Sequence, residues 1–350
     1  MEKYRIHKLK KGDTVDSVAV ELGITPFEVR GFHNSCCNWN DTIGHNFPTH
    51  ITELLVYPHI RKFRKELHPM TTFESGYTLR AKPTDKKVNY NVNYNIITED
   101  SITNTISCKI SLECKQKSNG YFVYEINKSE IFINDEEPNY MLDELAEKVT
   151  QNIYPLQIVV NEEGKYIGIH NFNEIKKRWE KSKKEILEYH SGNWVNDYLE
   201  LTDKTLENES SLQISLESDW FLSSFFGGIY INYTPFLKFE NSITFPILPK
   251  IKPLVYKVEQ TTDEYLDEFN QVIVEQNGIL NEERSKADIE NGLPFPNYSF
   301  SNPQAVKAQG TFTSRYFINS KNNTIESLFL QCSVLLDKPK KIEVIVALTN

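Results

Sequence analysis

Three shortages in this sequence of 350 residues exclude whole classes of protein. No segment reaches the roughly 18–20 consecutive apolar residues that a transmembrane helix needs, so we expect no membrane span. Acidic residues outnumber basic ones by 48 to 39, and the formal net charge of −9 repels a phosphate backbone. We therefore expect no nucleic acid among the partners. The third shortage is cysteine: the chain has five, and the next observations argue against a disulfide framework.

The five cysteines are predicted to be free thiols. Cys108 and Cys114 share one alternating run, ISCKISLEC, and in a strand their Cα atoms would lie about 20 Å apart, beyond the ~7 Å limit for a disulfide. The N-terminal MEKYRIHKLKKGD has no apolar signal-peptide core. Both observations lead us to expect synthesis in the cytoplasm without a signal peptide, so that export would need a secretion machine.

Common catalytic and cofactor motifs are absent as well. The chain contains no HExxH, no HxH, no GxSxG and no GxxxxGK[ST]. We expect a protein that is not an enzyme, with no catalytic residues and no cofactor. A pair of carboxylates for glycoside cleavage stays open, because only their separation in space matters.

Basic charge is concentrated in residues 174–189, EIKKRWEKSKKEILEY. Ile175, Trp179, Ile186 and Tyr189 fall on one helical face and leave charges of mixed sign outward. The pattern predicts a solvated amphipathic helix, with an electrostatic docking site as the alternative.

Residues 4–58 carry a strand–helix–helix–strand pattern. After the strand-like YRIHKLK come a glycine turn and then Asp13 and Thr14, whose side-chain oxygens can cap a helix. Apolar residues recur at helical spacing in TVDSVAVEL, and a second short helix begins at Pro26. A second strand, ELLVYP, ends the segment.

This segment resembles a LysM domain, the glycan-binding module of many bacterial wall proteins. The residues that carry the resemblance are Tyr4, Gly12, Asp13, Thr14, Val18, Ala19, Gly23, Ile24, Val29, Asn34 and the closing LLVYP. LysM modules bind N-acetylglucosamine polymers in a shallow groove between the loop after the first strand and the loop before the second. The resemblance implies that a glycan, or a protein partner, would contact Gly12, Asp13, Thr14, Asn34, Trp39, Ile43 and Gly44.

The loop before the second strand departs from the LysM pattern. Family members usually have a short loop with a Gly-Gln-like step, whereas this chain has SCCNWNDTIGHNFPTHITE. Trp39 in this loop offers a flat face for stacking. The spacing of its histidines with Cys36 and Cys37 matches no standard zinc pattern, so we expect no metal site. Gly12, Asp13 and Thr14 can equally be a turn and a helix cap.

The remaining sequence predicts an α+β fold. We expect a LysM-like module at 1–59, a connector at 60–85 and a domain at 86–350 with a curved antiparallel sheet and inserted helices. Strict alternation in VNYNVNYNI predicts its first strand. A break into two sub-domains near 227–250 is the alternative.

The function predicted from the sequence is non-enzymatic binding. The first hypothesis is an accessory, adaptor or cargo protein of a bacterial contractile injection or type VI secretion apparatus, docking through the LysM-like module. LysM-like domains also serve as joints in such assemblies, so this hypothesis depends on the resemblance. The second is a peptidoglycan-binding protein delivered to the wall, and the third is a LysM-linked peptidoglycan hydrolase.

Overall fold

The computed structural model describes residues 4–22, 24, 26–56, 69–73, 76–137, 141–190, 192–249, 251–297 and 306–349. Gly23 and the last two residues of LLVYP, which belong to the LysM resemblance, lie outside the described residues. The same holds for part of the predicted connector, residues 60–68 and 74–75.

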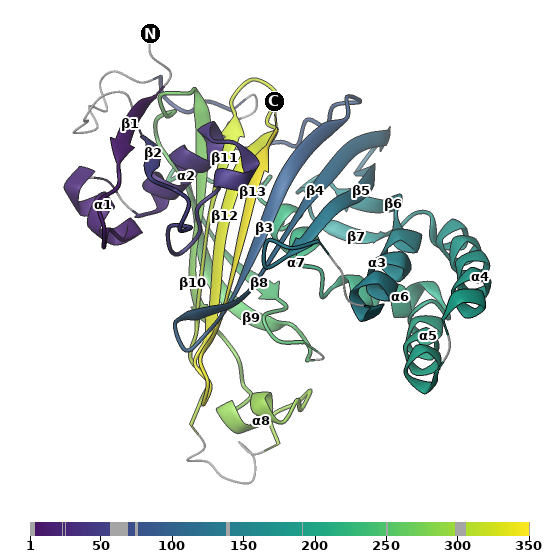
Figure 1. Ribbon diagram of the computed structural model, residues 1–350. Helices are drawn as coiled ribbons and strands as arrows, with labels where there is room; N and C mark the ends of the chain where they lie inside the picture. The colour runs from purple at the N-terminus through teal and green to yellow at the C-terminus, as the bar shows by residue number, and fades with distance from the viewer. Residues whose placement is uncertain are drawn as a thin grey trace.

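The N-terminal module, residues 4–56, has the predicted order of strand, helix, helix, strand (Figure 1). Its elements are β1 (Arg5–Lys8), α1 (Val15–Leu22), α2 (Pro26–Cys36), the 3-10 helix η1 (Trp39–Asp41) and β2 (Glu53–Val56). β1 and β2 pair antiparallel. The module has an apolar core of its own, built from Val15, Val18, Ala19, Val29, Ile43, Leu54 and Val56. This cluster is distinct from the larger buried cluster of the sheet.

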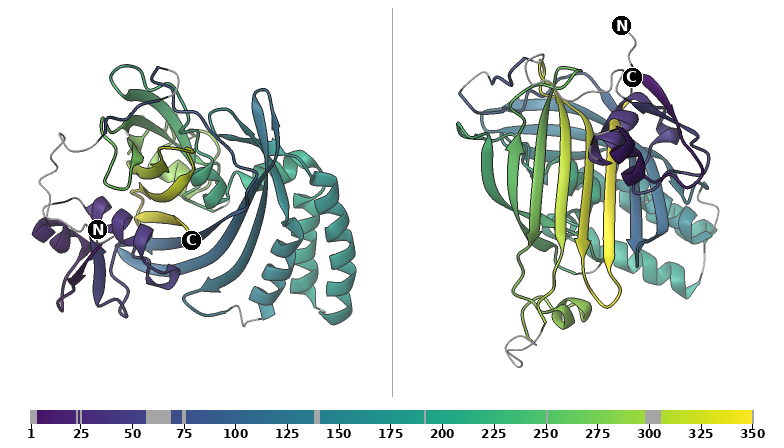
Figure 2. Two further views of the ribbon diagram at one scale, coloured as in Figure 1. Left: turned by 90° about the horizontal axis from the view of Figure 1, so that it is seen from above. Right: turned by 90° about the vertical axis from the view of Figure 1, so that its left-hand side faces the viewer.

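In the described part of the chain, an antiparallel sheet of eleven strands forms the body of the protein, which confirms the α+β class with a large sheet. The strand order is β7-β6-β5-β4-β3-β13-β12-β11-β10-β9-β8. The strands are β3 (Val88–Thr98), β4 (Ser101–Ser118), β5 (Tyr121–Ile133), β6 (Leu156–Asn161), β7 (Tyr166–Ile169), β8 (Lys238–Phe245), β9 (Leu254–Thr262), β10 (Gln271–Leu280), β11 (Thr311–Asn319), β12 (Ile325–Val334) and β13 (Lys340–Leu348). Seen from above, the sheet curves strongly (Figure 2, left).

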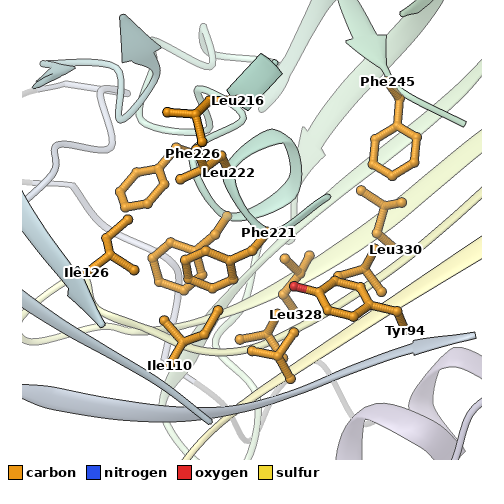
Figure 3. Packing of buried hydrophobic residues seen from close by; sticks show 14 of the residues in the cluster. Tyr94, Ile110, Ile126, Leu216, Phe221, Leu222, Phe226, Phe245, Leu328 and Leu330 are labelled. Carbon is orange, nitrogen blue, oxygen red and sulfur yellow. The ribbon is translucent and has the colours of Figure 1, made fainter. Parts of the chain in front are cut away.

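The inner face of the sheet packs around the short helix α7 (Trp220–Phe225). Phe221 and Leu222 lie among strand residues such as Ile110 and Leu328 (Figure 3). Ring contacts tie the helix to the sheet, for example Tyr90 to Phe225 with centroids 5.0 Å apart. We call the opposite side of the sheet the outer face.

Helices α3 (Met141–Ile153), α4 (Phe172–Tyr189), α5 (Asn193–Thr205) and α6 (Glu209–Leu216) form a lobe beside the β6–β7 end of the sheet (Figure 1). The basic segment is α4, and Ile175, Trp179 and Ile186 are buried as predicted. The prediction for Tyr189 was wrong, because its side chain is 82% exposed at the end of the helix. None of the described helices is both long enough and apolar enough to cross a membrane.

The alternative prediction was a break between two sub-domains near residues 227–250, and this region contains β8. This strand pairs antiparallel with β9 inside the large sheet. Apolar residues on both sides of the region, including Phe225 and Tyr256, belong to one buried cluster. A short helix, α8 (Lys286–Glu290), follows β10 and is closed by a capping box between Ser285 and Asp288.

Candidate functional site

The loop after β1 contains the first three predicted site residues, and each of them shapes the backbone. Gly12 has φ +95°, a left-handed conformation that favours glycine. Asp13 accepts a hydrogen bond from the backbone N–H of Lys10 at 2.7 Å, which closes the turn. Thr14 Oγ1 accepts from Ser17 N at 3.0 Å, while Ser17 Oγ accepts from Thr14 N at 2.9 Å. This reciprocal pair caps α1.

Asn34 and Ile43, also predicted at the site, hold each other in the module interior. The Asn34 side chain accepts from the backbone N–H of Ile43 at 2.8 Å and donates to the carbonyl of Ile43 at 3.0 Å. Ile43 is fully buried in the module core, and Asn34 is 5% exposed. These two residues position the loop, and both side chains are buried.

The outer face of the sheet is covered by the N-terminal module, around β12 and β13. In a strand covered on one face only, buried residues alternate with exposed ones. In β12, however, Leu328 and Leu330 face the inner core while the intervening Phe329 is also buried. Ile345 on β13 is buried in the same manner. Figure 2 (right) shows the module lying over this part of the sheet.

Helix α2 makes the apolar part of this module–sheet interface. Arg30 lies over the ring of Phe329, 4.3 Å from its centroid. A Cβ added to Gly31 would come within 2.5 Å of the Phe317 ring, so only glycine fits there without a shift. Burial lowers the pKa of Arg30, and the nearby charge of Glu343 opposes that shift. The helix is therefore in close contact with the sheet along this face.

Glu343 on β13 is the polar centre of the interface and is fully buried. Its Oε2 accepts hydrogen bonds from the backbone N–H of His45 at 2.8 Å and from Asn95 Nδ2 at 3.0 Å. Its Oε1 accepts from Gln331 Nε2 at 2.9 Å. Gly44 lies directly against Asn95, which leaves no room for a side chain. A buried carboxylate is tolerated because three donors satisfy it.

A groove of about 660 Å³ opens beside this interface. One wall is the module segment from Trp39 to His50, and the other is the outer face of β3, β4 and β5. We call it the junction groove. Its volume lies in the range of about 300–1,000 Å³ that is usual for ligand sites.

Trp39 stands at the junction groove opposite Phe132 of β5. The two ring centroids are 5.9 Å apart and the rings are tilted by 50°. Three carboxylates, Asp41, Glu130 and Asp135, also line the groove. Aromatic faces beside hydrogen-bonding groups allow an elongated ligand to be stacked and oriented.

The structure brings together only part of the predicted site. Trp39 and Gly44 both line the junction groove, whereas Gly12, Asp13, Thr14, Asn34 and Ile43 do not. Sequence reasoning missed the whole opposite wall, including Phe132, Asp135 and the asparagines Asn93 and Asn95. The alternation in VNYNVNYNI did place those asparagines on the face away from the core, but it could not show that a module covers them.

The Cys37 thiol and the His33 imidazole are both placed for packing, not for chemistry. Burial raises the pKa of the Cys37 thiol to about 12, so the thiolate is scarce at neutral pH. His33 is 2% exposed, its Nε2 lies 2.8 Å from the carbonyl of Asp41, and its Nδ1 accepts from the backbone N–H of Leu55 at 3.0 Å. Both groups serve the packing of the module.

Comparisons with known proteins do not show a family for this chain. No protein-family model matches it, and no curated protein matches it in sequence. A solved structure titled "Lipid-protein interactions in lipovitellin" is similar over 77% of this chain and 25% of that chain, with 9% identity and a TM-score of 0.42. This chain thus spans a quarter of the length of that protein, and a likeness of this size carries no conclusion about function.

Proposed function

We propose that this chain is a non-enzymatic binding and adaptor protein that docks through its LysM-like N-terminal module. The strand–helix–helix–strand order, the antiparallel pairing of β1 with β2 and the separate apolar core support a compact recognition module. The reciprocal cap of Thr14 with Ser17 and the clamp of Asn34 on Ile43 give physical roles to residues that carry the LysM resemblance.

The observation that carries the proposal is the close packing of the module on the sheet. Gly31 and Gly44 leave no space for a methyl group, and Glu343 ties the loop to the central strand β13. A module held in one orientation transmits force and alignment to the body, which a flexible tether cannot do. This geometry suits a joint within an assembly. We place the protein as an accessory, adaptor or cargo part of a bacterial contractile injection or type VI secretion apparatus, which would also deliver it.

Peptidoglycan is the second candidate partner. Trp39 is partly exposed at the junction groove, and its ring could stack on the apolar face of a sugar. The protein would then be a wall-binding protein carried out of the cell by another machine.

The test uses the tagged full-length chain recovered from its native cells, with N-acetylglucosamine oligomers present or absent. We expect spike or tube components of the apparatus to be retrieved equally in both conditions. Sedimentation of the purified chain with peptidoglycan, reversed by the oligomers and weakened by Trp39→Ala, would instead support the wall-binding candidate. Clearance of wall fragments by the purified chain would contradict a non-enzymatic role.

A further inference from the structure

The junction groove carries a charge of one sign. None of the residues described along its walls is lysine or arginine, whereas Asp41, Glu130 and Asp135 are acidic. Carboxylates in a concave site focus a negative potential and attract cationic groups. An anionic polymer would be repelled from the same place.

The three carboxylates differ in how far they are already neutralised. Lys109 pairs with Glu130 at 2.6 Å, so that charge is compensated. Asp41 lies 3.5 Å from the imidazole of His50, which is an exposed group. Asp135 has no ion pair among the described residues, and it sits at φ +65° in the turn that ends β5. Asp135 and Asp41 therefore keep negative charge at the groove.

The aromatic pair supplies the second half of a cation site. A Lys or Arg head group is attracted to the face of Trp within about 6 Å of the ring centroid. The methylene stems of these side chains also bury well against apolar surface. Trp39 and Phe132 provide that surface on the two walls, and Ile102, which is 37% exposed, extends it along β4.

Amide groups complete the groove floor. Asn93 donates to Thr42 Oγ1 across the module–sheet junction, and Asn95 donates to Glu343. These contacts fix both asparagines on the outer face of β3. Asn93 is only half-buried, and its carboxamide oxygen is an acceptor of the kind that a peptide N–H can pair with.

We propose that the junction groove binds an extended segment of a partner protein that carries lysine or arginine side chains. This inference rests on the proposed function, because it names the chemistry of the partner that an adaptor would hold. The side-chain cation lies between Trp39 and Asp135, with Asp41 as a second anion. The site is distinct from the positions Gly12 to Thr14, because it needs residues of the sheet as well as of the module.

The experiment measures fluorescence anisotropy of a labelled peptide of about twelve residues, alternating lysine with glycine, on addition of the full-length chain. A peptide with glutamate in place of lysine is the charge control. We expect the lysine peptide to bind and the glutamate peptide to remain free. Asp135→Asn and Trp39→Ala should each weaken binding by about five- to ten-fold, and salt should weaken it further because exposed charges are screened.

Matched substitutions separate the groove from the general acidity of the protein. Asp197 and Trp194 lie on the surface of helix α5, away from the groove, so Asp197→Asn and Trp194→Ala should leave the affinity unchanged. Equal losses in the groove and control variants would overturn the inference, as would unchanged binding in both groove variants. Binding of an N-acetylglucosamine hexamer that Trp39→Ala weakens, together with no binding of the lysine peptide, would assign the groove to glycan instead. Circular dichroism checks that each variant is folded.

The two proposals fail separately. If Asp135→Asn and Trp39→Ala still retrieve apparatus components, the adaptor function is supported and the groove is not the site of docking. If the lysine peptide binds through both groove residues but no apparatus component is retrieved from cells, the groove does bind a cationic segment. The placement of the protein in a secretion apparatus is then contradicted.

Discussion

The backbone N–H of His45 donates a hydrogen bond of 2.8 Å to the carboxylate of Glu343, which lies 298 residues later in the chain. This bond joins the loop before β2 to β13, the central strand of the eleven. The same carboxylate holds Asn95 and Gln331. One buried acid thus links the module to three neighbouring strands of the sheet.

Replacing this acid should loosen the module. In Glu343→Gln the two carboxylate oxygens that accept from three donors become one oxygen and one NH₂ group, so at least one donor loses its partner. A lost partner for a buried donor costs about 1–3 kcal/mol. We expect a lower free energy of unfolding in urea and faster amide exchange in helix α2. The matched control is Glu53→Gln, at an exposed position in β2 of the same module.

The role of Glu343 would be contradicted by amide exchange in α2 that is the same in Glu343→Gln and in the native chain. Equal loss of stability in the Glu53→Gln control would likewise show that the effect is not specific to the interface.

Two glycines give a second test of the module–sheet interface. A methyl group at Gly31 would strike the Phe317 ring, and one at Gly44 would strike the Asn95 side chain. Overpacking of this kind costs about 1–3 kcal/mol. We therefore expect Gly31→Ala and Gly44→Ala to lower the melting temperature and to weaken partner retrieval. Gly168→Ala on β7 is the control, because nothing lies within 4 Å of the added Cβ. Variants as stable as this control would show that the module is not tightly packed on the sheet.

The strands and helices with strict periodicity could be predicted from sequence. The alternation from Val88 onward and the helical spacing around Trp179 both correspond to elements of the structure. β8 was missed because its pattern is weak, and β9 was missed although its buried residues alternate regularly with less buried ones. KFENSITF in β8 is largely polar, and Gly278, which resembles a turn signal, lies inside β10. Pairing with neighbouring strands overrides the local signal at such positions.

The module–sheet interface could not be predicted from the sequence, for a different reason. Glu343 sits in IEVIVAL, a run whose continuous apolar residues indicate a strand buried on both faces. That signal shows that something covers the outer face, but it does not identify the N-terminal module as the cover. Contacts between residues about 300 positions apart leave no periodic trace in a single sequence. Trp39 was identified as a stacking residue, whereas its partner Phe132 was not.

His33 should make the module sensitive to acid. Burial lowers its pKa below the ordinary value of 6.5, and its Nδ1 accepts from Leu55 N only when unprotonated. As the pH falls, His33 of the unfolded chain therefore takes up a proton at a higher pH than His33 of the folded chain. The stability that neutral His33 contributes is fully present above about pH 6.5 and is lost as the pH falls below it. We expect the urea midpoint of the module to decrease from pH 7 to pH 5. His33→Gln should flatten that decrease, and His50→Gln, at an exposed imidazole, should not. A steep decrease that persists in His33→Gln would assign the acid sensitivity to another group.

Asp267 should have the opposite effect, so that stability decreases as the pH rises. This carboxyl is 3% exposed, and its Oδ1 accepts from Phe269 N at 2.9 Å and from Gln271 N at 2.8 Å. Burial raises its pKa from 3.8 to about 7, helped by the charges of Glu268 and Glu326 and opposed by the two N–H groups. The turn matters for docking, since Phe269 contacts Phe32 of α2 at 5.1 Å between centroids.

The sign of the effect follows from the raised pKa. Between about pH 4 and 7 the folded chain holds a proton that the unfolded chain has released, so stability decreases as pH rises through this window. Asp267→Asn keeps the oxygen that accepts both N–H groups and removes the charge. We expect it to match the native chain near pH 4 and to exceed its free energy of unfolding at pH 8 by on the order of a few kcal/mol. Asp197→Asn on the surface of α5 should show no such gain. If Asp267→Asn is less stable than the native chain at pH 8, the ionised carboxylate itself holds the turn, and the buried charge is not a cost to the fold.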